Sequence, residues 1–571
     1  SLLGLNTENR AYKYIPDKTI FAKKLGVDPK EIKVLDPFGG AGNLVFPAAQ
    51  IGLNVTASDY NPLAHIIQRS ILEFPSKYGP NIVKDFIKTA DIVINKTKDE
   101  CGKFFGVNHL AHLWCWCVRC PHCEQRVPLV NQMYIVNTPK NKIGLKFIVK
   151  NKDFTVEIIH NMSDKEGKKF TQRHGKAICI SCSNSINFKT IVENIAKNKD
   201  REMIAIQIQK NKSRDYVIPT TEDKKLHEDA VKYFKIKEKE FEKNDFFTND
   251  NILACQNKGK GHVLWLYGIK NWNEYFDTRQ LLVLSIFIKN IHNVCEKIPD
   301  KNLRKVLALY ISFILAKRID MSGFGVVWNP VGQKPQPVLS LRRPSLPYHF
   351  AETNPFLKMA GSFENIMKNI SDAIMFSTKL NDISKCNLES VTQKSDIKYD
   401  LILTDPPYAD TVQYGELSEF FYLWVYRALK NYFPELSSRV NLDEDFSECW
   451  GRFGSQQHAA KFFENGLKKS FVSMNDKLKD DGLMVVFFAH SSTEVWNLFL
   501  ESIKESKFRV ISSYAMHTEN ASNVLTRGKT SFMSSIVVVC RKILEPSEAY
   551  FEDLTPQIED KIKNMLKQIP K

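Results

Sequence analysis

Apolar and polar residues alternate near the start of the chain in blocks that predict strands and helices in turn. Residues 32–35 form a short apolar run, a glycine-rich turn follows, residues 44–51 have helical periodicity, and residues 55–58 form a second apolar run. This strand–helix–strand order indicates parallel strands covered by helices. Similar patterning returns in "YDLILTDPPY", "DGLMVVFFAH" and "SSIVVVCRK". We therefore predict one α/β sheet whose two halves lie more than 350 residues apart in the sequence.

The region between these halves has a different pattern. Cysteine pairs enclose a β-rich stretch between about 110 and 190, and charged helical periodicity dominates from about 220 to 320. Residues 321–356 are rich in Pro and Gly, so we predict a long loop, and such loops are usually functional or act as linkers. Its mixture of cations and aromatic rings is typical of nucleic-acid-binding segments, although a solvated loop has the same composition. The residues concerned are Trp328, Lys334, Arg342, Arg343 and Tyr348.

Composition narrows the class of protein. The chain has 571 residues and a formal net charge of +16, which suits a phosphate-rich partner such as nucleic acid. An AT-rich genome also produces abundant Lys, Asn and Ile, so the charge alone leaves both explanations open. The apolar runs are too short to cross a bilayer, and the first residues lack the order of a signal peptide. We therefore expect a cytoplasmic protein with no membrane partner.

Three glycines follow the first predicted strand and precede its helix, which lets a ligand approach the backbone at a helix N-terminus. They are Gly39, Gly40 and Gly42, and Asp59 closes the second strand 17 residues later, where a carboxylate can hold ribose hydroxyls. The turn lacks the third glycine of the dinucleotide fingerprint, which disfavours NAD. S-adenosylmethionine (SAM) instead suits glycines and an acid, Asp36, around its methionine part. A tight turn without a ligand would use the same glycines.

The apolar run 399–404 ends in Asp405, Pro406, Pro407 and Tyr408. Methyl transfer to an exocyclic amine of a base needs an acceptor against the N–H bonds, because the nitrogen lone pair is delocalised into the ring. The carboxylate of Asp405 and the carbonyl of Pro406 can supply that acceptor, and the rigid prolines fix both. Tyr408 offers a face on which a flipped-out base can stack. In the alternative interpretation, the motif only ends a strand and caps a helix.

The segment after this motif, "ELSEFFYLWVYRAL", has helical periodicity. Its aromatic residues recur at helical spacing, which predicts core positions rather than functional ones. Two residues outside this run are secondary candidates for lining a base pocket. Tyr414 lies just behind the motif, and His490 ends the strand "LMVVFFAH" at the carboxyl edge of the predicted sheet.

Two Cys-x-x-Cys pairs can place four thiolates on one tetrahedral ion. They are Cys120, Cys123, Cys179 and Cys182. Four sulfur ligands leave no open position, so we predict a structural zinc site in a ribbon with an inserted hairpin. A redox role is the alternative, but no thioredoxin-like βαβ pattern surrounds the pairs. Cys115 and Cys117 can either compete for the metal or pack as small apolar side chains, and we expect the latter.

The segments "DPFGGAG", "ASDYNP" and "TDPPYADTVQYGELSEFFYLW" resemble the SAM-dependent amino-methyltransferases, and most of all the adenine-specific DNA methylases that contain a zinc ribbon. The segments "DTRQLL" and "SSIVVVCRK" and the cysteine pairs fit the same family. The resemblance implies an α/β fold: a doubly wound methyltransferase sheet interrupted by a zinc-ribbon and helical insertion. It also implies N6-adenine methylation of double-stranded DNA with SAM, in a restriction-modification or phage-defence system with other subunits.

The resemblance also implies roles for individual residues. At the cofactor it implies Asp36, Phe38, Gly39, Gly40, Gly42 and Asp59. At the target amine it implies Asp405, Pro406, Pro407 and Tyr408, and Asp in the first position favours adenine over the N4 amine of cytosine. The acid that often contacts the cofactor adenine is replaced by Asn387, so this amide or Glu389 must serve. The family's basic, Pro-containing segment ahead of the first strand is missing, so we expect trimmed chain ends.

We predict five segments. Residues 1–105 are the SAM-binding half, 106–190 the zinc ribbon, 191–390 a mostly helical insertion with the Pro-rich loop that recognises the target, 391–545 the catalytic half, and 546–571 a helical tail. Two other functions stay open at this stage. The chain can be an RNA base amino-methyltransferase, or a catalytically silent DNA-binding subunit of a defence complex.

Overall fold

The computed structural model describes residues 18–211, 213–253, 263–341, 343–380, 384–409, 412–517, 534–545 and 551–567. The chain divides into two compact units. The first unit contains Ser1–Val391 and Pro407–Phe463, and the second contains Thr392–Pro406 and Glu464–Lys571. The chain therefore passes from the second unit to the first between Pro406 and Pro407, inside the predicted catalytic motif.

Three parallel strands of the first unit lie in the order β16-β2-β1. They are β1 (Lys33–Asp36), β2 (Asn54–Asp59) and β16 (Lys385–Leu388). Helix α2 (Val45–Gln50) connects β1 to β2, and α3 (Pro62–Gln68) follows β2. Val34, Val55 and Ala57 are fully buried, as expected for parallel strands covered on both faces. The predicted strand–helix–strand unit is confirmed.

A second sheet of the first unit is built on β3, which is buried at every position except its last. The strand order is β12-β11-β3-β15, and β4 also pairs with β3. The strands are β3 (His109–Arg119), β4 (Arg126–Pro128), β11 (Arg201–Lys210), β12 (Ser213–Val217) and β15 (His349–Thr353). The long, almost entirely buried β3 therefore has a hydrogen-bonded neighbour along both of its edges.

Two small antiparallel sheets adjoin the cysteine pairs in the sequence. One has the order β5-β6-β7 and the other β10-β9-β8. Their strands are β5 (Tyr134–Asn137), β6 (Lys142–Lys150), β7 (Asp153–His160), β8 (Gln172–Arg173), β9 (Lys176–Ile178) and β10 (Ser185–Ile186). The hairpin of β6 and β7 lies between the two cysteine pairs in the sequence, so the predicted inserted hairpin is confirmed.

The prediction of a structureless loop over 321–356 is wrong in part. The segment contains β15 and a hairpin of β13 (Val327–Asn329) with β14 (Lys334–Gln336). Trp328 is buried and its Nε1 donates to the carbonyl of Ile135 at 2.8 Å, so its ring is not available for stacking on a base. The hydroxyl of Tyr348 is hydrogen-bonded to that of Tyr267 at 3.1 Å. Lys334 is exposed, and Arg343 is half-buried. Arg342 lies outside the described residues.

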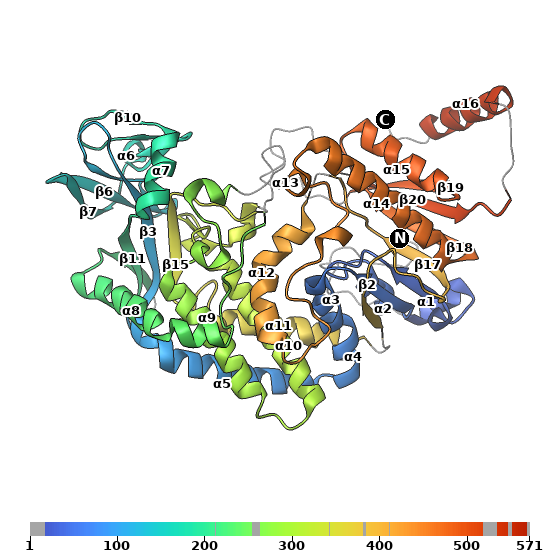
Figure 1. The fold of residues 1–571 in the computed structure, drawn as a ribbon, viewed down its shortest axis with the longest axis horizontal. Coiled ribbons are helices and arrows are strands. Elements are labelled where there is room, and N and C mark those ends of the chain that lie inside the picture. The colour runs from blue at the N-terminus through green and yellow to red at the C-terminus, as the bar shows by residue number, and fades with distance from the viewer. Residues whose placement is uncertain are drawn as a thin grey trace. The chain divides into compact units, whose positions relative to one another are not determined.

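Helices form the other layer of the first unit, and Figure 1 shows α5, α9, α10 and α12 packed together. The longer helices are α5 (Asn81–Cys101), α7 (Phe188–Asn198), α8 (Thr221–Lys243), α9 (Thr278–Cys295), α10 (Lys301–Asp320), α11 (Phe363–Ser377) and α12 (Tyr414–Leu429). Phe420, Tyr422 and Trp424 of α12 are fully buried, which confirms the core role predicted for that aromatic run. The short helices are α1 (Lys18–Leu25), α4 (Phe74–Tyr78), α6 (Asp164–Gly167) and α13 (Trp450–Phe453). The 3-10 and π turns are η2 (Pro29–Glu31), η3 (Arg69–Glu73), η4 (Gly102–Phe104), η5 (Leu264–Tyr267), η6 (Trp272–Tyr275), η7 (Val338–Leu341) and η8 (Leu442–Glu444).

A fully buried ion pair joins this helical layer to the β3 sheet. Arg279 of α9 donates from Nε and Nη2 to both carboxylate oxygens of Glu352 in β15, at 2.8 and 2.6 Å. Both side chains are completely buried. The indole of Trp114 also donates to Glu352, at 3.2 Å, and Asp277 caps the first turn of α9 by accepting from the Arg279 amide. The "DTRQ" segment is therefore a structural junction, because a buried charge needs partners of this kind.

The second unit contains strands in the order β17-β18-β20-β19. Strands β17 and β18 are parallel, whereas β20 is antiparallel to both of its neighbours. The elements are β17 (Tyr399–Thr404), β18 (Leu478–Phe488), α15 (Thr493–Glu505), β19 (Phe508–His517), β20 (Ser534–Lys542) and α16 (Phe551–Lys567), and α14 (Gln456–Lys477) leads into β18. The described chain is therefore a mixed α/β protein with parallel and antiparallel strands. None of its described helices combines the length and apolar character needed to span a membrane.

Candidate functional site

The glycine turn after β1 is tied to the end of β2 by a backbone hydrogen bond. The amide of Gly39 donates to the carbonyl of Ser58 at 2.9 Å. A Cβ on Gly39 would lie 2.7 Å from Nε2 of Gln68, so only glycine fits without moving its neighbours. Gly42 adopts a φ of +83°, which other residues rarely tolerate. The sequence therefore brings the turn close to β2 by using residues without side chains.

The side chain of Asp59, at the end of β2, connects that strand to the glycine turn. Its Oδ2 accepts from the Gly40 amide and its Oδ1 from the Asn61 amide, each at 2.8 Å. Burial raises the pKa of Asp59 to about 6, against the lowering effect of these two donors. Asp36 lies at the end of the neighbouring strand β1, where its Oδ1 accepts from the Phe38 amide at 3.1 Å. The predicted cofactor residues of the turn thus meet at the carboxyl ends of two parallel strands.

The end of β16 adds a third acid to the same edge. Ser58 Oγ and Asn387 Nδ2 donate to the same carboxylate oxygen of Glu389, at 3.0 and 3.1 Å. The amide of Glu389 in turn donates to the carbonyl of Asp59 at 3.0 Å. Asn387 therefore holds the carboxylate of Glu389 in place at the end of β16.

A buried ionic network beside Asp59 has no signal in the sequence. Arg452 donates to Asp445 Oδ2 and to Glu416 Oε2, at 2.8 and 2.9 Å, and both acids are almost fully buried. The negative charge of Asp445 adds to burial in raising the pKa of Asp59. Burial and the same acids hold the pKa of Tyr60 well above its usual value. These residues come from segments nearly 400 positions apart in the sequence, so no local pattern could have linked them.

The predicted catalytic motif follows β17. Asp405 is exposed directly after the strand, Pro406 is buried, and Pro407 and Tyr408 are half-buried. The next residue, Ala409, has a φ of 48°, an unusual backbone conformation for a residue with a side chain. Its carbonyl accepts from the Glu448 amide at 3.0 Å, which holds the chain in that conformation.

The two secondary candidates differ in accessibility. Tyr414 begins α12 in the first unit and is 45% exposed. His490 follows β18 in the second unit, where β18 runs parallel to β17, so it lies at the same sheet edge as Asp405. Its Nδ1 accepts from the Ser492 amide at 3.0 Å, which fixes the ring. Tyr414 is therefore the more accessible of the two aromatic candidates.

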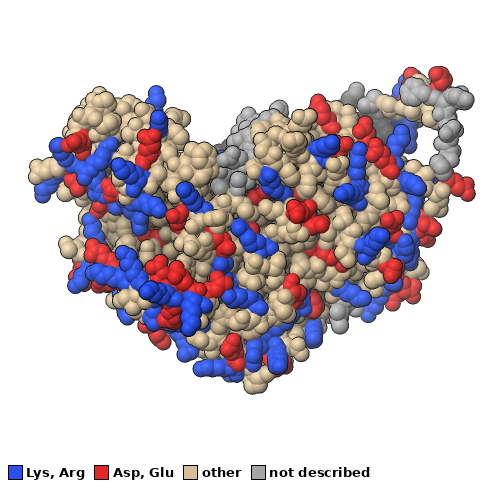
Figure 2. Space-filling view, in the orientation of Figure 1, with Lys and Arg blue, Asp and Glu red and all other residues tan. Residues whose placement is uncertain are grey.

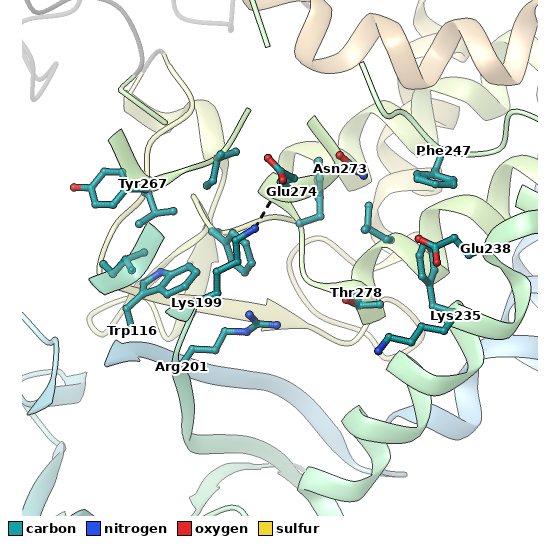
Figure 3. Close-up of a pocket in the computed structure, with 17 residues that line it drawn as sticks. Trp116, Lys199, Arg201, Lys235, Glu238, Phe247, Tyr267, Asn273, Glu274 and Thr278 are labelled. Atoms are coloured by element: carbon teal, nitrogen blue, oxygen red, sulfur yellow. Dashed lines mark ion pairs between the residues drawn. The ribbon is translucent and has the colours of Figure 1, made fainter. Parts of the chain in front are cut away.

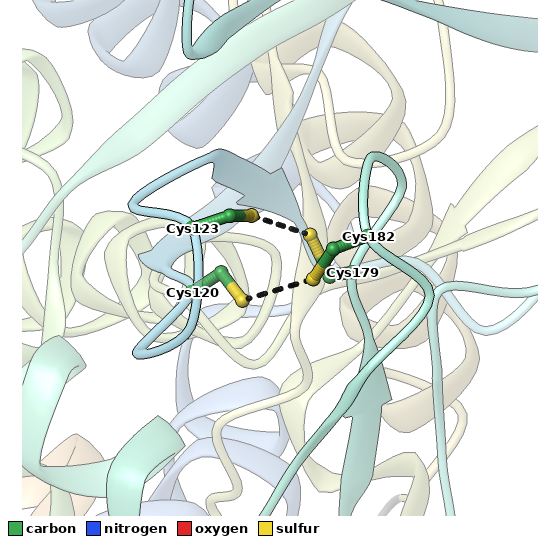
Figure 4. Close-up of side chains that lie close together, drawn as sticks. All are labelled: Cys120, Cys123, Cys179 and Cys182. Atoms are coloured by element: carbon green, nitrogen blue, oxygen red, sulfur yellow. Dashed lines mark hydrogen bonds between the residues drawn. The ribbon is translucent and has the colours of Figure 1, made fainter.

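The four predicted metal-binding cysteines converge. Their Sγ atoms all lie within 4.8 Å of one another, with Cys120 3.7 Å from Cys182 and Cys123 3.6 Å from Cys179 (Figure 4). Sulfurs bound tetrahedrally to zinc at about 2.3 Å lie about 3.8 Å apart, so these separations suit a shared ion. The four cysteines can therefore hold a metal such as zinc.

The two cysteine pairs occupy matching turns. The first lies between the antiparallel strands β3 and β4, and the second between β9 and β10. In each turn an amide donates back to the carbonyl of the first cysteine, from Glu124 to Cys120 at 2.9 Å and from Ser183 to Cys179 at 3.1 Å. Glu124 and Ser183 also share a left-handed conformation, with φ of 61° and 59°. Two equivalent Cys-x-x-Cys turns whose sulfurs converge are typical of a zinc ribbon.

The neighbouring Cys115 and Cys117 are buried in β3 and are not part of this cluster, as predicted for small apolar side chains. His122, between Cys120 and Cys123, is exposed and also stands outside the cluster.

Comparison with known proteins gives no assignment. No protein-family model matches the chain, and no curated protein is significantly similar to it. The functional argument therefore depends on the residues and the geometry described above.

Proposed function

We propose that the chain is a SAM-dependent methyltransferase that modifies the N6 amine of adenine in double-stranded DNA. The observation that carries the proposal is the Asp59 carboxylate, which holds the glycine turn through Gly40 at the carboxyl edge of parallel strands. In open α/β sheets ligands bind at this edge, and an acid after the second strand holds ribose hydroxyls. The lack of a dinucleotide fingerprint favours SAM over NAD.

Each acid of the edge has a separate role in this proposal. Asp59 accepts hydrogen bonds from the ribose hydroxyls, and Asp36 with the glycine turn borders the methionine part. Glu389 accepts from the adenine amine, with Asn387 holding its carboxylate in place. SAM, when bound, supplies an electrophilic methyl group on sulfur.

The residues of the Asp-Pro-Pro-Tyr motif act on the target base. A duplex hides the N6 amine, so the adenine must be flipped out, and Tyr408 provides the face on which it stacks. Asp405 and the Pro406 carbonyl accept the two N–H bonds of the amine, which localises the nitrogen lone pair for attack. Asp405 or solvent then takes the proton that the methylated amine releases. Transfer is direct, without a covalent enzyme intermediate.

The cysteine-bearing region has a structural and DNA-contacting role in this proposal, with zinc as the bound metal. Residues 140–176 carry ten Lys and Arg against four Asp and Glu. Figure 2 shows blue cationic side chains over the region of β6 and β7. Such clusters bind the phosphate backbone independently of sequence. The resemblance implies that this activity belongs to a modification or phage-defence system with other subunits.

Calorimetry with SAM tests the cofactor part of the proposal. Asp59→Asn is expected to lower the affinity for SAM about thirtyfold, because hydrogen bonds to a charged acceptor are lost. Asp91→Asn is the matched control, since Asp91 is an exposed acid on α5 and the substitution makes the same change of charge. The absence of saturable SAM binding to the unmodified chain would favour the catalytically silent subunit instead.

The affinity for SAM should also depend on pH. The pKa of Asp59 is raised to about 6, so below that pH the acid is protonated and no longer accepts from two hydroxyls. We expect a constant affinity above about pH 7 and a loss of about tenfold per pH unit below about pH 6. The same titrations on Asp59→Asn should show no such loss. An unchanged slope in that variant would assign the pH dependence to another group.

A further inference from the structure

A separate cavity of about 280 Å³ lies in the first unit between the β3 sheet and the helices (Figure 3). Its walls come from β3 and β11, from the end of α7, from α8 and from the segment that leads into α9. None of the cofactor, catalytic or cysteine residues lines it. The smallest pockets that hold small molecules have volumes of about 300 Å³, which is close to the size of this cavity.

Aromatic rings form much of the wall. Trp116 packs edge-on against Phe324, with ring centroids 5.0 Å apart, and Phe247, Phe276 and Tyr267 line other parts of the cavity. Planar rings of this kind favour a flat ligand that can stack against them.

Two polar atoms of the cavity residues are buried without a partner. The indole Nε1 of Trp116, a residue only 2% exposed, has no acceptor among the described residues, and Oδ1 of Asn273 has no donor. Buried polar atoms usually have a hydrogen-bond partner, so the absence of one at both atoms needs an explanation. Both residues line the cavity, so its wall contains a buried donor and a buried acceptor that no described residue pairs.

Two cations approach the cavity from opposite walls. Figure 3 shows Arg201 of β11 and Lys235 of α8 extending toward each other. Nη2 of Arg201 donates to Asp277 at 2.6 Å, and the guanidinium has further N–H donors on Nε and Nη1. Lys199 lies on the same side as Arg201, 3.8 Å from Glu274. A cation pair across a cavity is suited to an anionic group such as phosphate.

We propose that this cavity binds a nucleotide, with the phosphate between Arg201 and Lys235 and the base among the aromatic rings. A nucleobase is planar and carries ring acceptors for Trp116, while amine or sugar hydroxyl groups supply donors for Asn273. The nucleotide comes either from a free pool or from a single strand of nucleic acid, since both present the same chemistry. The inference does not depend on the proposed methyltransferase activity.

Calorimetry with the full chain tests the proposal. The probes are the four nucleoside 5′-monophosphates, each with the matching nucleoside, in saturating S-adenosylhomocysteine so that the proposed cofactor site is filled. At least one monophosphate is expected to bind with a Kd of about 100 μM, and its nucleoside about tenfold more weakly. Asp59→Asn should bind the monophosphate equally well, which separates this site from the cofactor site.

Matched variants locate the binding. Lys235→Glu is expected to weaken monophosphate binding about tenfold, whereas Lys239→Glu, an exposed lysine of the same helix outside the cavity, should have no effect. Trp116→Phe keeps a ring but removes the N–H, and a loss of about tenfold is expected. Trp265→Phe is its control, because Trp265 is 52% exposed and does not line the cavity.

A 5′-phosphorylated tetranucleotide identifies the source of the nucleotide. Binding at least about tenfold tighter than the monophosphate supports a nucleic-acid strand, and equal binding supports a free nucleotide. The proposal is overturned if neither probe binds, if Lys235→Glu binds as well as the unmodified chain, or if O-phosphoserine binds as tightly as the nucleotides. The last result would show that the cavity recognises phosphate without a base.

Discussion

Asp405→Ala is expected to reduce methyl transfer to DNA adenine by about a thousandfold while leaving the affinity for SAM unchanged. Asp405 is exposed at the end of β17, where its carboxylate can meet the amine of a flipped base. Removing one preorganised hydrogen-bonding group from an active site typically costs between about a hundredfold and a thousandfold in rate. Single-turnover transfer of labelled methyl groups from SAM to unmethylated duplex DNA measures this rate.

Asp400→Ala is the matched control for Asp405. Asp400 lies on the same strand and forms an ion pair with Lys479 at the surface, so its loss should leave the rate within about twofold. A second comparison tests the stacking role, since Tyr408→Phe should retain most of the activity and Tyr408→Ala should not. Full activity of Asp405→Ala would refute the assignment of the motif as catalytic.

Removal of the metal is expected to have the largest effect on stability. Zinc bound to four cysteines contributes on the order of 10 kcal/mol to folding in small zinc domains, and the β8, β9 and β10 strands are too short to stand alone. Cys123→Ser should therefore lose the metal and expose the cysteine-bearing region to proteolysis. Metal analysis of the purified chain should give one zinc ion per chain for the unmodified protein and almost none for the variant.

His122→Ala controls for local changes in the same turn. His122 is exposed between two proposed ligands but stands outside the sulfur cluster, so its variant should keep both metal content and protease resistance. Treatment of the unmodified protein with a chelator should reproduce the behaviour of Cys123→Ser. If the purified protein contains no metal and still resists proteolysis, the four cysteines have another role.

Local patterns predicted the parts of the chain whose partners are close in sequence. The turn with Gly39 and Gly42, the strand ending at Asp59 and the two cysteine turns each depend on a few neighbouring residues. Backbone conformation at these positions restricts the residue types that fit, so the signal is visible in a single sequence. The burial of Cys117 was predicted from its apolar neighbours in the sequence.

Contacts between residues far apart in the chain could not be predicted from a single sequence. β15 is only five residues long and becomes a strand because β3, more than 200 positions earlier, offers it an open edge. Trp328 was predicted to stack on a base, because no nearby residue indicates that its indole N–H donates to the carbonyl of Ile135. The approach of Asp445 to Asp59, nearly 400 positions away in the sequence, is hidden for the same reason. Tertiary contacts override local propensity at all of these places.

The most direct test of the proposed function is product analysis. The metal-loaded protein is incubated with labelled SAM and either unmethylated duplex DNA or structured RNA, and the nucleic acid is digested to nucleosides. We expect label in N6-methyladenine from the duplex DNA, and none in the same reaction with Asp405→Ala. Label in N4-methylcytosine, label only in RNA, or no label from a protein that binds SAM would contradict the proposal.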